Sequence, residues 1–278
     1  MMFKGTLQAI TVYAVCIVIS LITVGPFLWM LSTSFKLPTE ATVLPPEWIP
    51  SPFTWESYRG LFDNQILPFG RFIFNSVYIS ILVVIGRLLA CALAGYGFAR
   101  LEFPGRDIAF GMLLASLMIP DMLAVIPLYS AYARIGWIDT HWPLIIPPII
   151  ANTFGTFLLR QFFKTIPKDY EEAALIDGAS HWEIFWRIMI PLAKPALATV
   201  GVLTFISSWN DFFLPLVFLT SIEKFTLPVG LAFYQGELST DYTSLMAGSV
   251  LAILPTLVIY VLAQRYFTQG VVLTGVKG

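Results

Sequence analysis

Three ionisable side chains fall inside otherwise apolar stretches, and they are the first candidates for chemistry in this sequence. Arg87, Asp121 and Asp211 each lie in a segment that is long enough to cross a membrane. A charge at the centre of a bilayer costs roughly 2.5–3.5 kcal/mol on insertion scales, so each group is expected to face protein or water. Two interpretations stay open: the groups line a solute path, or they have structural roles, in the case of Asp121 at a solvated kink.

A polar and aromatic run, Ser207-Ser208-Trp209-Asn210-Asp211, lies close to one of these charges. Hydroxyl and amide groups beside a flat aromatic ring suit a sugar-like solute. The same residue types are also typical of hydrogen bonds that hold membrane helices together. Trp209, Asn210 and Asp211, with Asp121, are therefore candidates for a translocation path, with helix packing as the alternative.

The sequence offers no catalytic residue and no metal site. His141 and His181 lie on opposite sides of the membrane in the topology predicted below, so they cannot share a metal ion. Neither H-E-x-x-H nor G-x-S-x-G occurs, and the phosphate-binding pattern G-x-x-x-x-G-K-[ST] is also missing. We therefore expect no cofactor in this chain, and any active transport must draw its energy from another chain or from an ion gradient.

One long polar segment, residues 160–194, interrupts the apolar pattern. After Pro167, Asp169 is the predicted N-cap of a helix, with Glu172 three residues later. Gly178 suits the end of that helix, because a residue in the left-handed conformation is usually glycine. Ser180 and Glu183 then have the spacing of a capping box and predict a second helix.

On the second helix Trp182, Phe185 and Met189 are spaced to share one face, and Pro191 is expected to end it. The segment thus predicts a helix, a glycine corner and an amphipathic helix. Ala173 and Ala174 would offer a smooth surface to another protein. Glu172 would either pair with a basic group of that partner or cap its own helix.

These groups must be positioned by membrane helices, as the composition indicates. The chain has 278 residues, of which 57% are hydrophobic and 12% charged, against about 25% charged in soluble domains. The mean hydropathy is +0.78. A net charge of −1 provides no basic footprint for nucleic acid. Cys16 and Cys91 fall in apolar stretches, where small packing residues are expected.

The fold predicted is an all-α polytopic membrane protein, a single domain over residues 1–278 with six transmembrane helices. Helices are required because the hydrocarbon core offers the backbone no water partner. Pro120 and Pro127 should break the third span. Gly86, Ala90 and Ala94 recur every fourth residue and predict close packing of the second span. The six spans are predicted at residues 7–31, 72–98, 108–129, 142–159, 195–220 and 245–264.

The distribution of lysine and arginine orients these spans. With both termini in the cytoplasm, the inner segments hold ten of these residues and the outer segments five, as the positive-inside tendency requires. The segment 160–194 is then cytoplasmic. The outer loops 32–70 and 221–243 are either docking sites for an external partner or solvated connectors.

The polar segment also carries a family resemblance. Glu172-Ala173-Ala174, three residues, Gly178, nine residues and then Ile188-x-Ile190-Pro191 resembles the EAA loop of ABC importer permeases, E-A-A-x3-G-x9-I-x-L-P, with Ile190 where the pattern has leucine. Residues 157–163, 176–180, 195–199, 209–212 and 275–278 are similar to the maltose-type carbohydrate permeases. The resemblance covers roughly residues 70–278 and favours the smaller, six-span permease.

The resemblance implies a type I ABC importer transmembrane domain in a bacterial or archaeal cytoplasmic (inner) membrane. Its implied partners are a second permease in a heterodimer, two cytoplasmic ATPase subunits that bind ATP and Mg²⁺, an extracytoplasmic solute-binding protein and the lipid bilayer. The implied ATPase joint comprises Glu172, Ala173, Ala174, Gly178, Ala179 and Pro191, with Trp182 and Phe185 as anchors to the permease body.

A second contact with the ATPases is implied at the C-terminal tail, through Gly275 and Lys277. The alternative function is an ion-coupled secondary transporter that works without an ATPase. In that case Asp121, Arg87 and Asp211 would be the coupling groups.

Overall fold

The computed structural model describes residues 2–150, 152–235 and 241–275, without the side chains of residues 2–9, 121 and 265–275. The chain forms two compact units, which are described separately. The first unit comprises residues 1–70 and 230–254, and the second comprises residues 71–229 and 255–278.

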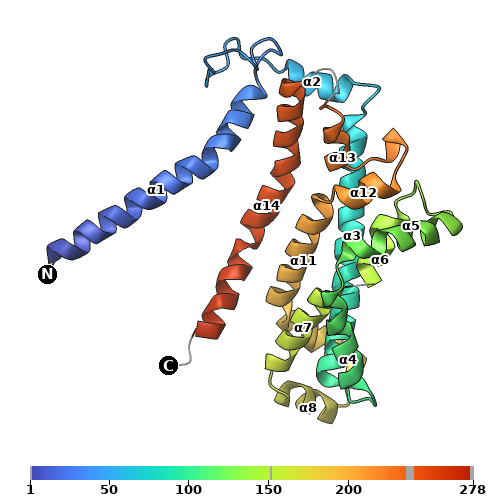
Figure 1. Cartoon of the computed structure of the whole chain (residues 1–278). Helices are drawn as coiled ribbons and strands as arrows, with labels where there is room; N and C mark the ends of the chain where they lie inside the picture. Colours follow the sequence, from blue (N-terminus) through green and yellow to red (C-terminus); the bar gives the residue numbers. More distant parts are fainter. Residues whose placement is uncertain (1, 151, 236–240, 276–278) are drawn as a thin grey trace. The chain divides into compact units, whose positions relative to one another are not determined.

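All regular elements of the described residues are helices (Figure 1). In chain order they are α1 (Met2–Thr33), α2 (Glu56–Asp63), α3 (Phe69–Arg100), α4 (Arg106–Ala115), η1 (Ser116–Met118), η2 (Asp121–Ala124), α5 (Val125–Arg134), α6 (Trp142–Ile150), α7 (Thr153–Thr165), α8 (Asp169–Ile176), α9 (His181–Ile184), η3 (Phe185–Met189), α10 (Ile190–Leu192), α11 (Lys194–Trp209), α12 (Phe213–Phe218), η4 (Ile222–Lys224), α13 (Leu227–Ala232) and α14 (Tyr242–Gly275). The all-α prediction is confirmed.

Four helices of the described chain are long and apolar enough to cross a membrane, namely Ile10–Thr33, Phe69–Arg100, Trp142–Thr165 and Tyr242–Gln264. Two bent helix pairs raise that number to six if each pair counts as one span. Arg106–Met118 and Met122–Arg134 meet at 86°, with Pro120 between them. This bend confirms the predicted break in the third span, whereas the exact span bounds and the single-domain organisation stay predictions.

Small residues let α3 approach its neighbours in the second unit. A Cβ added to Gly86 would lie 2.4 Å from the Cδ1 of Ile149 in α6. A Cβ added to Gly155 in α7 would lie 2.8 Å from the sulfur of Cys91. Because any larger residue would have to displace these neighbours, the predicted packing role of Gly86 is confirmed, and buried Cys91 acts in the same way.

At one end of the second unit an apolar cluster joins α3, α7, α8, η3 and α11. Its buried members are Cys91, Ala92, Tyr96, Leu159, Phe163, Ile166, Ala174, Ile184, Phe185, Met189, Ala193, Ala196 and Val200. Full burial of one large side chain stabilises by about 1.5–3 kcal/mol, so this cluster is a firm base for the elements that it joins.

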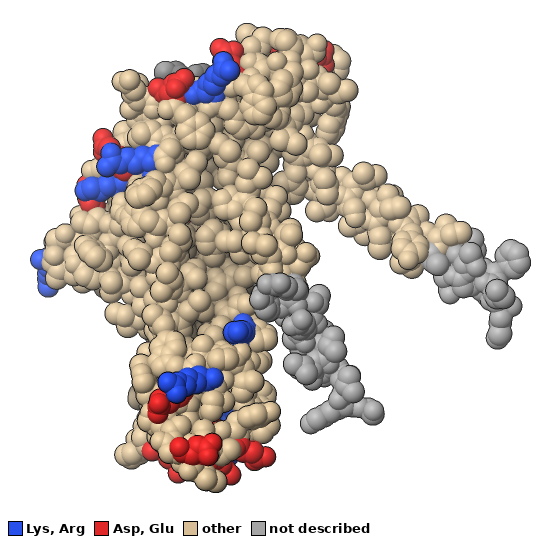
Figure 2. All heavy atoms as spheres, turned by 180° about the vertical axis from the view of Figure 1, so that it is seen from behind, with Lys and Arg blue, Asp and Glu red and all other residues tan. Residues whose placement is uncertain are grey.

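Charged side chains are unevenly distributed over the second unit. Figure 2 shows acidic side chains gathered at the end of this unit that carries α8, with few charges over the wide band beside it. An uncharged band of this kind suits contact with lipid, because charges in the hydrocarbon region are costly.

Candidate coupling site and intramembrane cavity

Helix α8 lies within the predicted polar segment 160–194. Residues 169–192, which run from α8 to α10, are here named the corner segment. The first turn of α8 holds Asp169, Glu171 and Glu172, and negative charge there is favoured by the helix dipole. The prediction that Asp169 is the N-cap is wrong. Lys168 occupies that position without a side-chain cap, because the helix already includes Asp169 as its first residue.

The glycine corner is confirmed in detail. Gly178 has φ +83°, the left-handed conformation that other residues adopt only with strain. The N–H of Gly178 donates to the carbonyl of Leu175 at 3.0 Å, and the N–H of Ala179 donates to that of Ala174 at 2.9 Å. This pair of bonds is a Schellman motif, which ends α8 at a fixed angle.

A capping box starts the next helix, as predicted. The Ser180 hydroxyl accepts from the Glu183 N–H, while the Glu183 carboxylate accepts from the Ser180 N–H at 3.0 Å. The Ser180 N–H and hydroxyl both donate to the Glu183 carboxylate, and these two hydrogen bonds lower the pKa of Glu183. The two caps leave only a short connection between α8 and α9, which therefore behave as a rigid corner.

The helix after the corner does not end at Pro191. It passes through α9, the π-helical turn η3 and α10, and it bends by 77° before α11 begins at Lys194. Pro191 is tolerated because the π-helical turn just before it already departs from the regular α-helical ladder of hydrogen bonds. The segment thus leads directly into α11.

Burial separates the predicted residues of the corner segment into two groups. Phe185 is 1% exposed and, with Ala174, belongs to the apolar cluster, so it fixes the segment to the second unit. Trp182 stacks on Phe185 at 5.9 Å but is 60% exposed, so its predicted role as an anchor is wrong. Trp182 lies in the first turn of α9, whereas Phe185 and Met189, which share its predicted face, are buried at the two ends of the π-helical turn.

The exposed group is what a partner protein would meet. Glu172, Ala173 and Gly178 are exposed, and Ala179 is half-buried. The Glu172 side chain makes no hydrogen bond or ion pair with the described part of the chain, so the capping alternative is unsupported. Ile176 is 86% exposed at the tip of α8. Sequence reasoning missed it, although an isoleucine beside the glycine stop of a polar helix is a usable signal.

Sequence reasoning also missed the charge that fixes α8 to its unit. The buried acid of this helix is Glu171, whose Oε1 lies 3.1 Å from the Nε of Arg100 at the end of α3. The Arg100 Nη2 donates to the carbonyls of Phe163, at 2.6 Å, and of Ile166. No local sequence signal links residues 100 and 171, because the contact depends on how α3 and α8 pack.

A cavity of about 290 Å³ lies between α3, α5, α6, α11 and α12. Its polar lining comes from Arg87, Ser207, Ser208 and Asp211, and prolines of α6 and apolar residues complete the wall. The Asp211 carboxylate accepts from the Leu214 N–H at 3.3 Å at the gap between α11 and α12. Asp211 therefore accepts a hydrogen bond at the start of α12 and lines the cavity, while its role in a translocation path stays a prediction.

Arg87 of α3 lies in the same wall and contacts a helix break. Its Nε donates at 2.8 Å to the carbonyl of Pro148 in α6. The residue four positions later lies in the gap between α6 and α7, so that carbonyl has no place in a continuous helical ladder. The Arg87 guanidinium thus binds a carbonyl that has no hydrogen-bond partner within the proline-containing helix α6.

Two other candidates of the translocation path, Trp209 and Asn210, do not line this cavity. Trp209 is 2% exposed, stacks on Phe205 at 5.5 Å and lines a separate apolar groove. Asn210 is exposed, and its Nδ2 donates to the carbonyl of Ile206 at 2.9 Å. Asp121 is the first residue of η2, and its side chain lies outside the described residues. The structure thus brings Asp211 and Arg87, but not Trp209, to one cavity.

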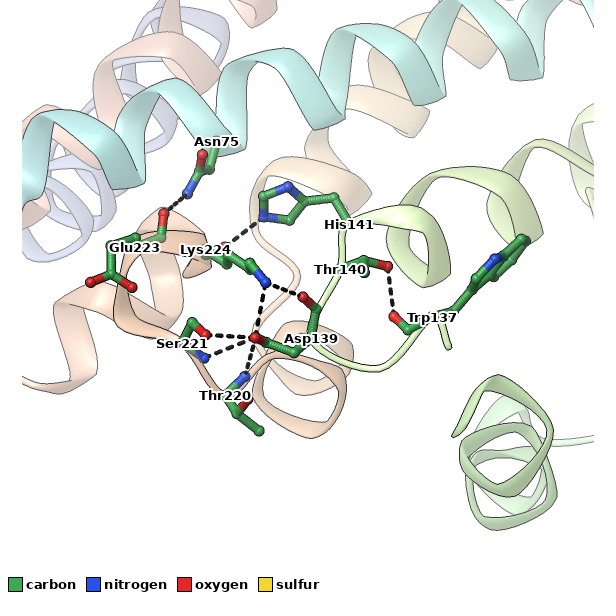
Figure 3. A network of polar contacts seen from close by, with 9 residues as sticks. All are labelled: Asn75, Trp137, Asp139, Thr140, His141, Thr220, Ser221, Glu223 and Lys224. Carbon is green, nitrogen blue, oxygen red and sulfur yellow. Dashed lines mark hydrogen bonds and ion pairs between the residues drawn. The ribbon is translucent and has the colours of Figure 1, made fainter. Parts of the chain in front are cut away.

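A second polar network fixes the two loops at the other end of this unit (Figure 3). The Asp139 carboxylate accepts from the N–H groups of Thr220 and Ser221, both at 2.9 Å, from the Ser221 hydroxyl at 2.5 Å and from Lys224 Nζ at 2.9 Å. Burial alone would raise the pKa of Asp139, but these bonds hold it well below its usual range. The loop before α6 is thereby tied to the loop after α12.

The structure describes only part of the C-terminal tail that was predicted to contact the ATPases. Helix α14 extends to Gly275, and Lys277 lies outside the described residues. The proposed contact with ATPase subunits thus stays a prediction.

Comparison with known proteins decides the family. Residues 83–272 match the family described as "Binding-protein-dependent transport system inner membrane component". The chain belongs to this family. The permease is 36% identical to the arabinooligosaccharides transport system permease protein AraQ of Halalkalibacterium halodurans, over 94% of this chain and 93% of the relative. It is 35% identical to the inner membrane ABC transporter permease protein YcjP of Escherichia coli, over 99% of both chains.

The solved structures agree on the fold. A chain of a bacterial ABC transporter involved in the import of the acidic polysaccharide alginate superimposes with a TM-score of 0.86 at 24% identity, over 95% of the permease and 98% of that chain. Together with the family match and the relatives above, this makes the permease a multi-pass inner membrane component of an ABC importer. None of these comparisons supports an ion-coupled secondary transporter.

Proposed function

We propose that this permease is the membrane subunit of an ATP-driven importer of a sugar or oligosaccharide, and that the corner segment is its joint with a cytoplasmic ATPase subunit. The observation that carries the proposal is the rigid corner at Gly178, capped on both sides, with Glu172 and Ala173 left exposed. Relatives named for the transport of arabinooligosaccharides, diacetylchitobiose and trehalose support a carbohydrate as the solute.

The proposed joint works because it is stiff. ATP and Mg²⁺ bind to the partner ATPase subunits, whose closure moves α8 as a lever. A flexible joint would dissipate such a motion before it reached the membrane helices. Glu172, Ala173, Gly178 and Ala179 supply the docking corner. Ala174, which was predicted to share that surface, is buried, and with Phe185 it connects the corner to the apolar cluster.

The proposed solute path passes the cavity of Arg87, Ser207, Ser208 and Asp211. Hydroxyl groups of a sugar can exchange hydrogen bonds with these side chains, and the apolar wall suits the faces of its rings. The same groups also serve the helix start at Leu214 and the break at Pro148, so the path would reuse structural polar groups.

The proposed assembly contains a second permease, two ATPase subunits and an extracytoplasmic solute-binding protein. Both termini face the cytoplasm, which agrees with ten basic residues on the inner side against five on the outer side. That orientation places the corner segment on the ATPase side and the Asp139 network on the opposite side. Gly275 and Lys277 form a second ATPase contact in this assembly.

Reconstitution tests the proposal. The permease is co-purified with candidate partners, namely a second permease, an ATPase and a solute-binding protein. Uptake of a panel of labelled sugars into proteoliposomes is then measured with ATP or with an ion gradient. We expect uptake that requires ATP and the ATPase subunits, with one class of sugar stimulating ATP hydrolysis. Gradient-driven uptake by the permease alone would refute the proposal.

A further inference from the structure

The buried guanidinium of Arg100 connects three elements at the end of the second unit that carries α8. The Arg100 side chain, 4% exposed, belongs to the last residue of α3. Its Nη2 donates to the Phe163 and Ile166 carbonyls at the C-terminal end of α7. A cation is favoured at such a helix end, because the last carbonyls have no partner within the helix.

An arginine of α7 makes the corresponding contact with α3. The Arg160 Nε donates at 3.2 Å to the carbonyl of Phe98 in the last turn of α3, and its guanidinium lies 3.7 Å from the centre of the Phe110 ring. The ends of α3 and α7 are therefore joined by two arginines, each of which binds the carbonyls of the other helix. This arrangement gives Arg100 a fixed position relative to both helices.

Glu171 is the acid of α8 that reaches this site. Its side chain is 13% exposed, and its Oε1 lies 3.1 Å from the Arg100 Nε. Neither atom has a hydrogen-bond partner in the described part of the chain, so the contact depends on charge rather than on an aligned hydrogen bond. Burial raises the pKa of Glu171, and the charges of Arg100, His181 and Lys168 oppose that shift.

Geometry thus distinguishes Glu171 from the other acids of its helix. Asp169 and Glu172 are exposed, whereas Glu171 turns toward the body of the unit. The buried Ala174 of α8 packs into the apolar cluster, where its methyl group selects no single partner. The ion pair instead fixes one point of α8 to one point of α3.

We propose that the Arg100–Glu171 ion pair transmits the displacement of α8 to α3, which makes both side chains positioning residues for transport. This inference rests on the proposed function of α8 as the ATPase joint. Helix α3 also carries Arg87, which lines the cavity and lies about 20 Å from Arg100 along a helix that rises 1.5 Å per residue. A shift of α8 would therefore reach the cavity wall through one continuous helix.

The test compares two variants of α8 in the reconstituted complex, each of which replaces a carboxylate with an uncharged amide. Glu171→Gln keeps the shape of the side chain and removes its charge, whereas Asp169→Asn removes an exposed charge from the same helical turn. Three quantities are measured: co-purification with the ATPase subunits, ATP hydrolysis, and sugar imported per ATP hydrolysed. For Glu171→Gln we expect normal co-purification and an import-to-hydrolysis ratio reduced about fivefold or more, the lower end of typical coupling effects. Asp169→Asn should match the parent in all three.

Arg100→Lys is a second test variant, in which position 100 keeps its positive charge. Lysine has no planar fork, so it cannot hold the α7 carbonyls and Glu171 together, and the ratio should again fall. The inference is overturned if both variants import as much sugar per ATP as the parent, or if uptake and hydrolysis fall in parallel at an unchanged ratio. Failure of the proposed function looks different, because the parent complex itself would then show no ATP-dependent uptake.

Discussion

Substitution of Gly178 tests the corner at a single backbone position. Alanine there must adopt φ +83°, which costs an L-residue roughly 1–2 kcal/mol. The added methyl group meets no atom within 4 Å, so backbone strain is the whole expected cost. Asparagine tolerates this conformation better than alanine and should cost less.

Proline at the same position should be far more damaging. Its ring fixes φ near −65° and removes the N–H that donates to Leu175, so the Schellman motif cannot form. A misplaced proline of this kind costs about 3 kcal/mol or more. The predicted order of uptake is thus glycine, asparagine, alanine and proline, with alanine reducing the population of the corner by about fivefold per kcal/mol of strain.

The assay is ATP-dependent sugar uptake by the reconstituted complex, with membrane content and co-purification of the ATPase measured for each variant. We expect Gly178→Pro to remain in the membrane and to lose uptake. Normal uptake by this variant would refute the role of the corner as a joint. Equal damage from alanine and proline would refute the conformational argument, since alanine has room for its side chain.

Four further predictions address other parts of the permease. Glu172→Lys should weaken ATPase association, and unchanged co-purification across a salt series would contradict this. Asp211→Ala should assemble normally but lose stimulation of ATP hydrolysis by sugar; normal transport would leave Asp211 with its structural role alone. Phe185→Ala should lower the free energy of unfolding by about 3–5 kcal/mol, whereas exposed Trp182→Ala should change it much less, as thermal unfolding can show. The pKa of Asp139 is lower in the folded state, so its stabilising contribution is fully present above about pH 4 and is lost as the pH falls below that. The difference in thermal unfolding midpoint between the parent and Asp139→Asn should therefore narrow only in acid.

Local signals carried most of what the sequence could predict. Gly178 and the pair Ser180 and Glu183 act within a few residues, so their spacing alone located the corner and both caps. Pro120 located the bend of the third span for the same reason, because its ring limits the backbone at its own position. The fold class followed from composition, since lipid leaves the backbone few alternatives to helix.

Predictions that depended on packing were less successful. The face of Trp182 was inferred from an α-helical period, which groups it with Phe185 and Met189 but does not show how far the apolar cluster extends along that face. The pairing of Glu171 with Arg100 depends on the arrangement of separate helices, so no spacing along the chain could reveal it. Trp209 and Asp211 are two positions apart, but they line different hollows because α11 ends between them.

The contact between Arg87 and Pro148 has a consequence for the order in which the membrane helices are inserted. The candidate span Trp142–Thr165 has a mean hydropathy of 1.4, whereas that of Phe69–Arg100 is 2.3. The more apolar helix carries the half-buried guanidinium of Arg87, and the less apolar helix carries the acceptor. Each therefore supplies what the other lacks in lipid, where an unmatched charge or carbonyl is costly. Helix α3 is synthesised before α6, so Arg87 is expected to stay near water or lipid headgroups until α6 is inserted. The two helices would then take their final positions in the bilayer together.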